Sequence, residues 1–419
     1  MRPRFEPALP LPDMPRLQGE LDALASLSST PPPGVTRILF TETDLAGRDF
    51  VRALMRDAGL TVIEDAAGNI VGRWLGTDGD RGRVGTGSHC DAIPHAGRYD
   101  GTVGVLGGIA AVRLLRAHGF VPRRTIDVIM FTSEEPTRFG IGCAGSRLLS
   151  SALQPEALAT LTDEQGVTFD QARQRAGYTG ALSDVPLRDD DYASFVELHV
   201  EQGPILEREV LSIGVVSAIA APASFTVTFR GAGGHAGTVL MPERQDALVP
   251  AAILVCQAEN LARSSGSPDT VATAGKLQVY PGAINSIPRE VTVSFDVRDT
   301  HGPTRDRVVA DIRDLAARLA AERGLQHEIQ DINSDPPQIA DASIISAIET
   351  ACDRFGLTHR QLVSRAYHDA LFMARIAPMG MIFVPSVGGI SHRPDEFTAA
   401  NDIANGVRVL ADVLMQLSA

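Results

Sequence analysis

Residues 82–135 read GRVGTGSHCDAIPHAGRYDGTVGVLGGIAAVRLLRAHGFVPRRTIDVIMFTSEE, and this stretch determines the expected fold. It opens with a run of apolar and small residues that ends at His89. A helical segment with a glycine stop follows at 104–119, and an apolar run from 125 then ends in Glu134 and Glu135. A strand, a helix and a second strand at this spacing predict a βαβ unit, and therefore an α/β domain with a mostly parallel sheet.

The pattern changes in the middle of the chain. The segment ASFTVTFRG at 223–231 alternates apolar and polar side chains, as a half-exposed antiparallel strand does. Two further strand patterns and two helical patterns follow it. A chain of 419 residues is long enough for two or three domains. We therefore expect a catalytic domain made of 1–218 and 333–419, interrupted by a small α+β sandwich at 219–332.

The composition argues against several classes of function. The formal net charge is −13 and no basic patch stands out, which argues against a nucleic-acid partner. No run reaches the roughly 18 apolar residues of a membrane-spanning helix, so we expect no membrane partner. The first residues lack the apolar segment of a signal peptide, and the four cysteines form no CxxC motif. A cytoplasmic, reducing location is the simplest expectation.

Histidines and acids gather in five short segments where strands are expected to end. The residues in question are His89, Asp91 and Asp100, then Glu134 and Glu135, and finally His199, His235 and His392. The carboxyl ends of parallel strands form the usual ligand crevice of an open α/β sheet. Side chains that are distant in the sequence can therefore converge there.

These residue types suit a site with two divalent metal ions. Such ions lie about 3.5–4 Å apart and share a bridging ligand, with further protein ligands for each ion. Three histidines, one glutamate and a shared aspartate would supply that set. Of the adjacent pair Glu134 and Glu135, one carboxylate can then bind metal while the other accepts a proton from water.

Simpler interpretations exist for single residues taken alone. His89 and Asp91 can form a strand-end hydrogen bond without a metal, and a glutamate pair can be a solvated strand end. Cys90 is expected to be a small buried side chain and not a ligand, because thiolates suit softer metals. His95 is expected to have a structural role or to lie at the rim of the pocket.

Seven separated motifs carry a resemblance to a known family. They are GSHCDAIPHAGRYDG, FTSEEPTRFG, ELHVEQGPILE, GGHAGTVLMPERQDA, NSIPREVTVSFDVRD, YHDALFMA and MGMIFVPSVGGISH. From about residue 35 to the C-terminus the chain resembles the dinuclear-metal amidohydrolases of the M20 peptidase clan. It is similar to the branch of allantoate amidohydrolase, ureidoglycolate amidohydrolase and N-carbamoyl-L-amino acid hydrolase, and most similar to ureidoglycolate amidohydrolase. The segment SRAYHDA departs from the carbamoylase pattern at Arg365 and Tyr367, whose roles stay open.

The resemblance implies a mostly parallel-sheet metallohydrolase domain with an inserted α+β sandwich that serves as a dimerisation and lid domain. It also implies two divalent ions per subunit, with Mn²⁺ favoured and Zn²⁺, Co²⁺ or Ni²⁺ as alternatives. One ion would be held by His89, Asp100 and His199. The other would be held by Asp100, Glu135 and His392, so that Asp100 bridges the two ions.

The resemblance assigns further roles within the catalytic domain. Glu134 is expected to be the general base, and Asp91 is expected to orient His89 by holding its second ring nitrogen. The substrate pocket would be lined by Gln202, His368, Gly388 and Gly389. A second interpretation of His368 as the plain start of a helix stays open.

The inserted domain is expected to complete the site of a partner subunit. By resemblance, His235 and Asn285 would stabilise the oxyanion, and Arg298 would bind a substrate carboxylate. All three would reach across the interface of a homodimer. For Arg298 a surface ion pair remains the alternative.

The expected reaction is hydrolysis of the ureido C–N bond of a small ureido acid. Ureidoglycolate is the first choice, with glyoxylate, ammonia and carbon dioxide as products, and allantoate and N-carbamoyl-L-amino acids are the alternatives. A peptidase of the same clan is disfavoured, because peptidase relatives tend to have a carboxylate at the position of His199. An inactive binding protein that retains the fold is the remote alternative, since Glu134 and all five expected metal ligands are present.

Overall fold

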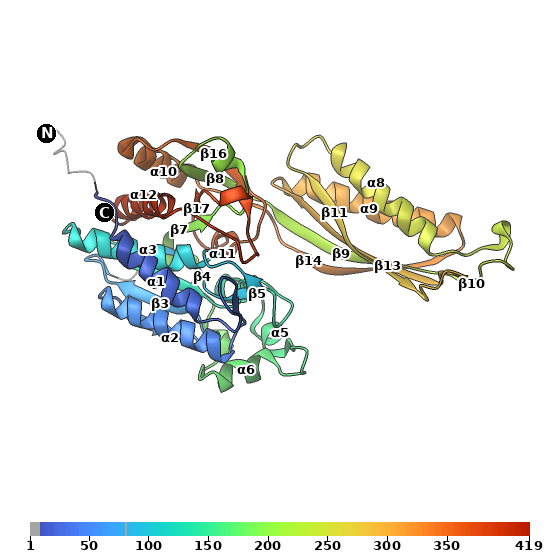
Figure 1. Cartoon of the computed structure of the whole chain (residues 1–419), viewed down its shortest axis with the longest axis horizontal. Coiled ribbons are helices and arrows are strands. Elements are labelled where there is room, and N and C mark those ends of the chain that lie inside the picture. The colour runs from blue at the N-terminus through green and yellow to red at the C-terminus, as the bar shows by residue number, and fades with distance from the viewer. Residues whose placement is uncertain (1–8, 80–81) are drawn as a thin grey trace. The chain divides into compact units, whose positions relative to one another are not determined.

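The computed structural model describes residues 9–79 and 82–419, which form two compact units (Figure 1). The first unit contains the residues up to Ser217 together with Ala340–Ala419, and the second is Ala218–Ile339. The chain therefore returns from the second unit to the first between Ile339 and Ala340, later than the expected boundary at 332/333. The reason is that strand β14 (Gln326–Ser334) still pairs with strand β9 (Ala221–Arg230) of the second unit.

A nine-stranded sheet lies at the centre of the first unit, in the order β15-β8-β17-β7-β4-β6-β3-β2, with β16 paired to β8. Its outermost strand β15 falls in the last two residues of the second unit and pairs with Ala218 and Ile219 of β8. Its four central strands β17, β7, β4 and β6 are parallel, and the strands beside them pair antiparallel. The predicted α/β class is confirmed, with antiparallel strands added at both sides of the parallel centre. The bounds are β2 (Thr61–Glu64), β3 (Ile70–Trp74), β4 (Arg83–His89), β6 (Ile126–Phe131), β7 (Tyr192–Val200), β8 (Ile213–Ile219), β15 (Gln338–Ile339), β16 (His359–Ser364) and β17 (Met379–Val384).

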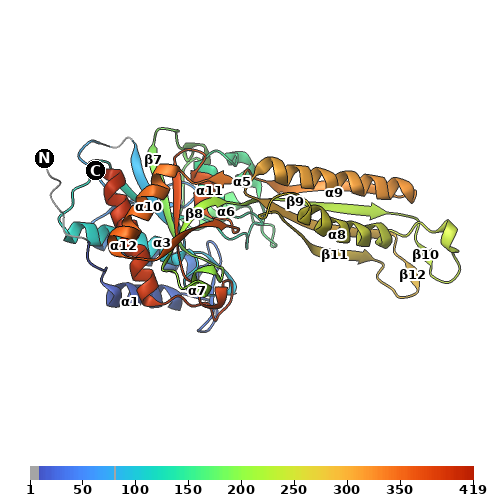
Figure 2. The same cartoon turned by 90° about the horizontal axis from the view of Figure 1, so that it is seen from above.

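The parallel strands are buried along nearly their whole length because helices cover both faces of the sheet. Every residue of β4, β6 and β17 is buried. Helices α3, α10 and α12 pack on one face, while α11 lies on the other (Figure 2). The helices of this unit are α1 (Met14–Ser26), α2 (Glu42–Asp57), α3 (Thr102–Ala117), α4 (Ala144–Leu149), α5 (Pro155–Thr160), α6 (Phe169–Arg175), α7 (Ile205–Arg208), α10 (Ala342–Phe355), α11 (Asp369–Met373) and α12 (Ala400–Ser418).

The carboxyl ends of the parallel strands bring distant segments to one edge of the sheet. Strand β4 ends at His89, and β6 ends just before Glu134. Strand β7 ends one residue after His199, and β17 leads into the loop that carries His392. A short ribbon of β1 (Val35–Arg37) and β5 (Ala92–Ala96) lies beyond β4. Open α/β sheets bind ligands in the crevice outside the carboxyl ends of their strands.

The second unit is a four-stranded antiparallel sheet with two helices on one face (Figure 1). Residues of β13 alternate strictly between buried and half-buried positions, because only one face of the sheet packs against the helices. The rings of Phe225 and Phe295 stack at 5.5 Å in its core. Its elements are β9, β10 (Gly234–His235), α8 (Leu248–Arg263), β11 (Val271–Tyr280), β12 (Ser286–Ile287), β13 (Glu290–Asp299), α9 (Gly302–Glu322) and β14.

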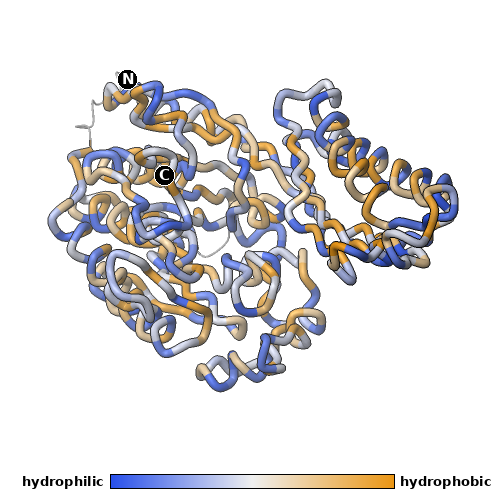
Figure 3. The backbone as a smooth tube through the Cα atoms, turned by 45° about the vertical axis from the view of Figure 1, so that its right-hand side comes forward, coloured by the Kyte–Doolittle hydropathy of each residue, from blue (hydrophilic) through white to orange (hydrophobic). Residues whose placement is uncertain are grey.

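Hydrophobic and hydrophilic residues alternate along the helices of both units (Figure 3). This alternation is typical of helices that bury one face and expose the other. Within residues 9–79 and 82–419, no helix has both the length and the apolar character needed to cross a bilayer.

Candidate active site

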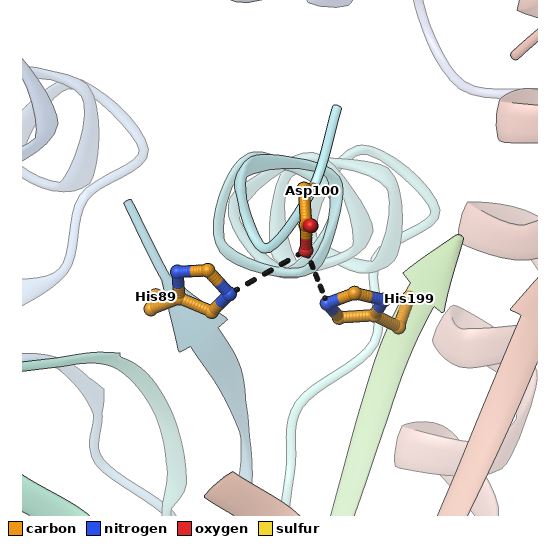
Figure 4. Close-up of side chains that lie close together, drawn as sticks. All are labelled: His89, Asp100 and His199. Carbon is orange, nitrogen blue, oxygen red and sulfur yellow. Dashed lines mark ion pairs between the residues drawn. The ribbon is translucent and has the colours of Figure 1, made fainter. Parts of the chain in front are cut away.

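Two histidines from neighbouring strands face one oxygen of Asp100 (Figure 4). His199 Nε2 lies 3.2 Å and His89 Nε2 lies 3.7 Å from Asp100 Oδ1. The two histidines lie at the ends of strands β4 and β7, and Asp100 lies just before α3. All three side chains are buried, so this group sits below the protein surface.

The second oxygen of Asp100 faces a different pair of side chains. His392 Nε2 lies 3.1 Å from Asp100 Oδ2 and 3.3 Å from Glu135 Oε1. Asp100 is thus shared by two groups of potential metal ligands, one with His89 and His199 and one with Glu135 and His392. The side chain of His392 is 46% exposed, so this second group is the one that opens to solvent.

The hydrogen bonds of the two buried histidines fix their ring orientation. His89 Nδ1 lies 3.0 Å from the carbonyl oxygen of Asp91, and His199 Nδ1 lies 2.9 Å from that of Val200. A carbonyl oxygen can only accept, so each Nδ1 carries the proton. In the neutral rings each Nε2 is then an acceptor near the Asp100 carboxylate, and His199 Nε2 also accepts from the Gly101 N–H at 3.2 Å. Two acceptors that face each other need a proton or a metal cation between them, and imidazole and carboxylate ligands suit divalent first-row metals.

Burial and the close approach of like and unlike charges shift the pKa values of Asp100, Glu135 and His392. Burial would raise the pKa of Asp100, but the neighbouring imidazoles of His199, His392 and His89 outweigh it and hold that pKa well below its usual range. Burial, together with the negative charge of Asp100, raises the pKa of Glu135 to about 7. The hydrogen bond to Asp100 raises the pKa of His392 to about 9. The residues present therefore fit a divalent metal centre.

Asp91 has a different contact from the one expected. Its carboxylate accepts the backbone N–H groups of Glu134 at 3.3 Å and Glu135 at 3.0 Å. The carboxylate lies 3.7 Å from His89 Nδ1, whereas the carbonyl oxygen of Asp91 accepts from that nitrogen. The backbone of Asp91 therefore orients His89, and its side chain holds the glutamate pair in place.

Glu134 lies beside the potential metal ligands, with one oxygen hydrogen-bonded and the other turned toward His89. Its Oε2 is 3.7 Å from His89 Nε2, while its Oε1 accepts from the Cys143 thiol at 3.3 Å. Burial raises the pKa of Glu134 well above its usual range, and the neighbouring charge of Glu135 adds to the shift. Carboxylates with perturbed pKa values in such clusters are candidates for general acid–base roles.

Several residues around these groups adopt backbone conformations that side chains usually avoid. Ser133, Cys143, Gln202 and His392 have φ values of 57°, 56°, 55° and 58°. Residues with positive φ cost free energy and concentrate at active sites and ligand-binding loops. His95 is also in this region, with φ 58°, and it is exposed, in keeping with a place away from the buried groups.

The expected pocket residues of the first unit make different kinds of contact. Gln202 Nε2 donates to Asp100 Oδ2 at 2.9 Å, and Gln202 Oε1 is buried without a hydrogen-bond partner among the described residues. The His368 ring centroid lies 4.5 Å from that of His199, and burial lowers its pKa well below the usual value. The N–H of the exposed Gly388 donates to Glu207 at 2.7 Å, and the half-buried Gly389 follows it in the same turn. Cys90 is fully buried, and burial raises its pKa to about 12.

The three expected residues of the second unit are not all together. His235 and Asn285 are neighbours, because the Ala236 N–H donates to the Asn285 carbonyl at 2.9 Å. Both His235 and Asn285 are exposed. Arg298 lies at the far end of β13 from this ribbon and pairs with Asp296 at 2.7 Å. Within the second unit, the structure therefore brings His235 and Asn285 together and separates Arg298 from them.

Glu197 is a buried acid that the sequence patterns did not single out. It lies in β7 two residues before His199, is fully buried, and accepts from Ser88 at 2.7 Å and from the Ala370 N–H at 2.9 Å. An acid inside an otherwise apolar strand pattern was the available signal. Its two donors come from segments distant in sequence, so only the folded chain reveals them.

Gly101 is a further residue whose role the structure shows. Its φ is 66°, and a Cβ atom there would lie 2.4 Å from His89 Nε2. We expect Gly101→Ala to lower the free energy of unfolding by about 1–3 kcal/mol more than Gly119→Ala does, measured by chemical denaturation. Gly119 is the matched control, because it has φ 78° but nothing within 4 Å of the position that a Cβ atom would take. Equal effects of the two substitutions would contradict the close contact with His89.

The comparison with known proteins agrees with this geometry. Residues 85–416 match the family model of Peptidase family M20/M25/M40. The chain is 51% identical over 407 residues to a ureidoglycolate hydrolase of Oryza sativa subsp. japonica, covering 96% of this chain and 84% of the relative. It is 38% identical over 404 residues to an N-carbamoyl-L-amino acid amidohydrolase of Geobacillus stearothermophilus, covering 96% and 98% of the two chains.

Solved structures give the same result. Crystal structures of AtUAH in complex with (S)-hydroxyglycine and with glyoxylate are 48% identical to this chain, with a TM-score of 0.86. The match covers 98% of this chain and 99% of theirs. The resemblance that the seven motifs indicated is confirmed, and the chain belongs to peptidase family M20/M25/M40.

Proposed function

We propose that this chain is a metal-dependent amidohydrolase that cleaves the ureido C–N bond of ureidoglycolate. The observation that carries the proposal is Asp100, which is shared by two ligand groups beside a half-buried Glu134. The 51% identity to a ureidoglycolate hydrolase over nearly the whole chain supports the choice of substrate. The products would be ammonia, carbon dioxide and glyoxylate.

The metal ligands in this proposal are His89, Asp100, Glu135, His199 and His392, and Mn²⁺ is the favoured ion. When bound, divalent ions would supply Lewis-acid chemistry and make water acidic enough to ionise near neutral pH. Asp100 would be the ligand shared by the two ions, and the support is that each of its oxygens faces a separate ligand group.

Glu134 would move the proton. Its Oε1 is engaged by the Cys143 thiol, so Oε2 is the oxygen available to accept a proton from the attacking water. Glu134 would then return that proton to the leaving amine, as a general base that becomes a general acid. Asp91 keeps Glu134 in place through the backbone, and Gln202 Oε1 provides an unsatisfied acceptor for an N–H group of the ureido substrate.

An ammonia-release assay on metal-stripped protein tests the substrate and the metal together. The panel would hold ureidoglycolate, allantoate and several N-carbamoyl-L-amino acids, each measured with Mn²⁺ or Zn²⁺ added back. We expect the highest kcat/KM with ureidoglycolate and Mn²⁺, and no turnover in the presence of a chelator. Faster turnover of an N-carbamoyl-L-amino acid would favour the second candidate, which rests on the 38% identical relative.

We further propose that the chain acts as a cytoplasmic homodimer in which the second unit of one subunit completes the site of the other. The exposed pair His235 and Asn285 supports this, since neither side chain has a buried role of its own. The four free cysteines are in keeping with a reducing compartment. Arg298 would bind the substrate carboxylate of the partner's site.

Mixing two inactive variants tests the shared site. A Glu134→Gln chain and a His235→Ala chain should each be inactive as pure dimers. After dissociation and reassociation at equal amounts, we expect about a quarter of the wild-type activity, because half of the dimers then contain one intact site. No recovery in confirmed mixed dimers would show that His235 serves its own subunit or none.

A further inference from the structure

Glu396 accepts a hydrogen bond from the backbone of Asp100, the residue shared by the two ligand groups. Glu396 is only 4% exposed, although it lies in the loop after β17, four residues beyond His392. Its Oε1 accepts the N–H groups of Tyr99 at 2.8 Å and Asp100 at 3.1 Å. One carboxylate oxygen therefore fixes the two peptide groups from which the Asp100 side chain projects.

Ser391 connects the second oxygen of Glu396 to the Asp100 side chain. Its Oγ lies 3.0 Å from Glu396 Oε2 and 3.0 Å from Asp100 Oδ2. The Gln202 amide nitrogen lies 2.9 Å from Asp100 Oδ2 and 3.3 Å from Ser391 Oγ. A hydroxyl has one proton and an amide nitrogen has two. Gln202 can therefore donate to Asp100 and Ser391, while the single proton of Ser391 is shared between Asp100 Oδ2 and Glu396 Oε2.

The chain makes room for this contact at Gly97. A Cβ atom at Gly97 would lie 2.3 Å from Glu396 Cβ and 2.5 Å from its Oε1. Any larger residue at this position would push Glu396 away from the peptide groups of Tyr99 and Asp100. The segment before Asp100 and the loop after His392 are thus packed directly against each other.

A contribution to folding alone does not account for a carboxylate here. Glu396 and Asp100 are both buried acids separated by one hydroxyl group, and like charges at such distances oppose each other. Cations bound at Asp100 would offset that repulsion. The arrangement is therefore suited to a protein that binds metal at Asp100.

We propose that Glu396 and Ser391 are positioning residues that hold Asp100 and His392 in the geometry needed to share two metal ions. The inference rests on the metal centre of the proposed function. Glu396 fixes Asp100 through the backbone, and Ser391 fixes the oxygen that faces His392. Partners that orient metal ligands in this way typically change metal affinity by about 10–100-fold when they are replaced.

Mn²⁺ titration of the metal-stripped protein, followed by the electron paramagnetic resonance of free Mn²⁺, tests this proposal. We expect Glu396→Gln and Ser391→Ala each to weaken the binding of at least one Mn²⁺ by about 10–100-fold. The glutamine keeps an oxygen for the two N–H groups but cannot accept from Ser391 through its nitrogen. Asp395→Asn is the matched control, since Asp395 is the exposed neighbour that pairs with Arg393 at 2.7 Å.

Thermal unfolding of the metal-free variants separates positioning from folding. We expect Ser391→Ala to melt at the wild-type temperature without metal and to gain less stability on addition of Mn²⁺. Wild-type Mn²⁺ affinity in both variants, or an affinity loss matched by equal destabilisation of both metal-free variants, would overturn the proposal. Mn²⁺ binding requires no substrate, so failure to hydrolyse ureidoglycolate would reject the proposed function and leave this inference standing.

Discussion

Glu134→Gln is expected to lower kcat for ureidoglycolate by about 10²–10⁴-fold, the range that a positioned general base contributes. The substitution keeps the size of the side chain and its contact with Cys143, but it removes the oxygen that can accept a proton beside His89. Ammonia release under saturating substrate and Mn²⁺ measures the effect. KM should change much less than kcat, because the lost interaction belongs to the proton transfer.

The metal content of the variant decides what the lost activity means. Glu134 is not one of the proposed ligands, so Glu134→Gln should retain both Mn²⁺ ions. Glu156→Gln, which changes an exposed glutamate on α5, is the control and should keep wild-type activity. Turnover by Glu134→Gln at the wild-type rate would exclude Glu134 as the base.

Asp100→Asn is expected to abolish tight binding of divalent ions and, with it, turnover. Asp100 is the one residue that faces both ligand groups, with His199 at 3.2 Å from one oxygen and His392 at 3.1 Å from the other. The neutral amide removes the charge that both groups share. We expect Mn²⁺ affinity to fall by more than about 100-fold, the upper end of the effect of replacing a residue that only orients a ligand.

Equilibrium dialysis with Mn²⁺ measures this loss directly, and Asp22→Asn provides the control. Asp22 is an exposed acid that pairs at 2.8 Å with Arg98, which lies two residues before Asp100. The control should bind two ions as the wild type does. If Asp100→Asn also binds two ions tightly, then Asp100 does not bridge them and the assignment of the centre fails.

Much of the fold could be predicted from local patterns. The helical segment at 104–119 and the apolar runs around it form α3, β4 and β6, because a buried parallel strand needs apolar residues on both faces. The boundary near 332 could not be placed from periodicity. Strand β14 is an exposed edge strand whose residues lack a clear alternation, and its end is set by pairing with β9.

The candidate site was partly accessible to the same reasoning. Histidines and acids at predicted strand ends identified the residues that the structure gathers around Asp100. The role of the Asp91 backbone, the burial of Glu197 and the contacts of Glu396 were not accessible. Each depends on an atom-to-atom distance between segments that are remote in sequence, and no local pattern records such a distance.

The amino-acid sequence by itself determined the α/β class, the family and the identity of the residues that converge. The class follows from hydrophobic period, the family from its resemblance in seven ordered motifs, and the converging residues from residue types at strand ends. Only the tertiary structure decided how the residues act on one another. It divides the two oxygens of Asp100 between two ligand groups. Backbone carbonyl groups hold Nδ1 of His89 and His199, so that Nε2 of each ring faces Asp100. Glu396 holds the backbone of Asp100. The physical reason is that hydrogen bonds and ion pairs depend on distances of a few ångströms, which exist only after the strands have paired and the loops have packed.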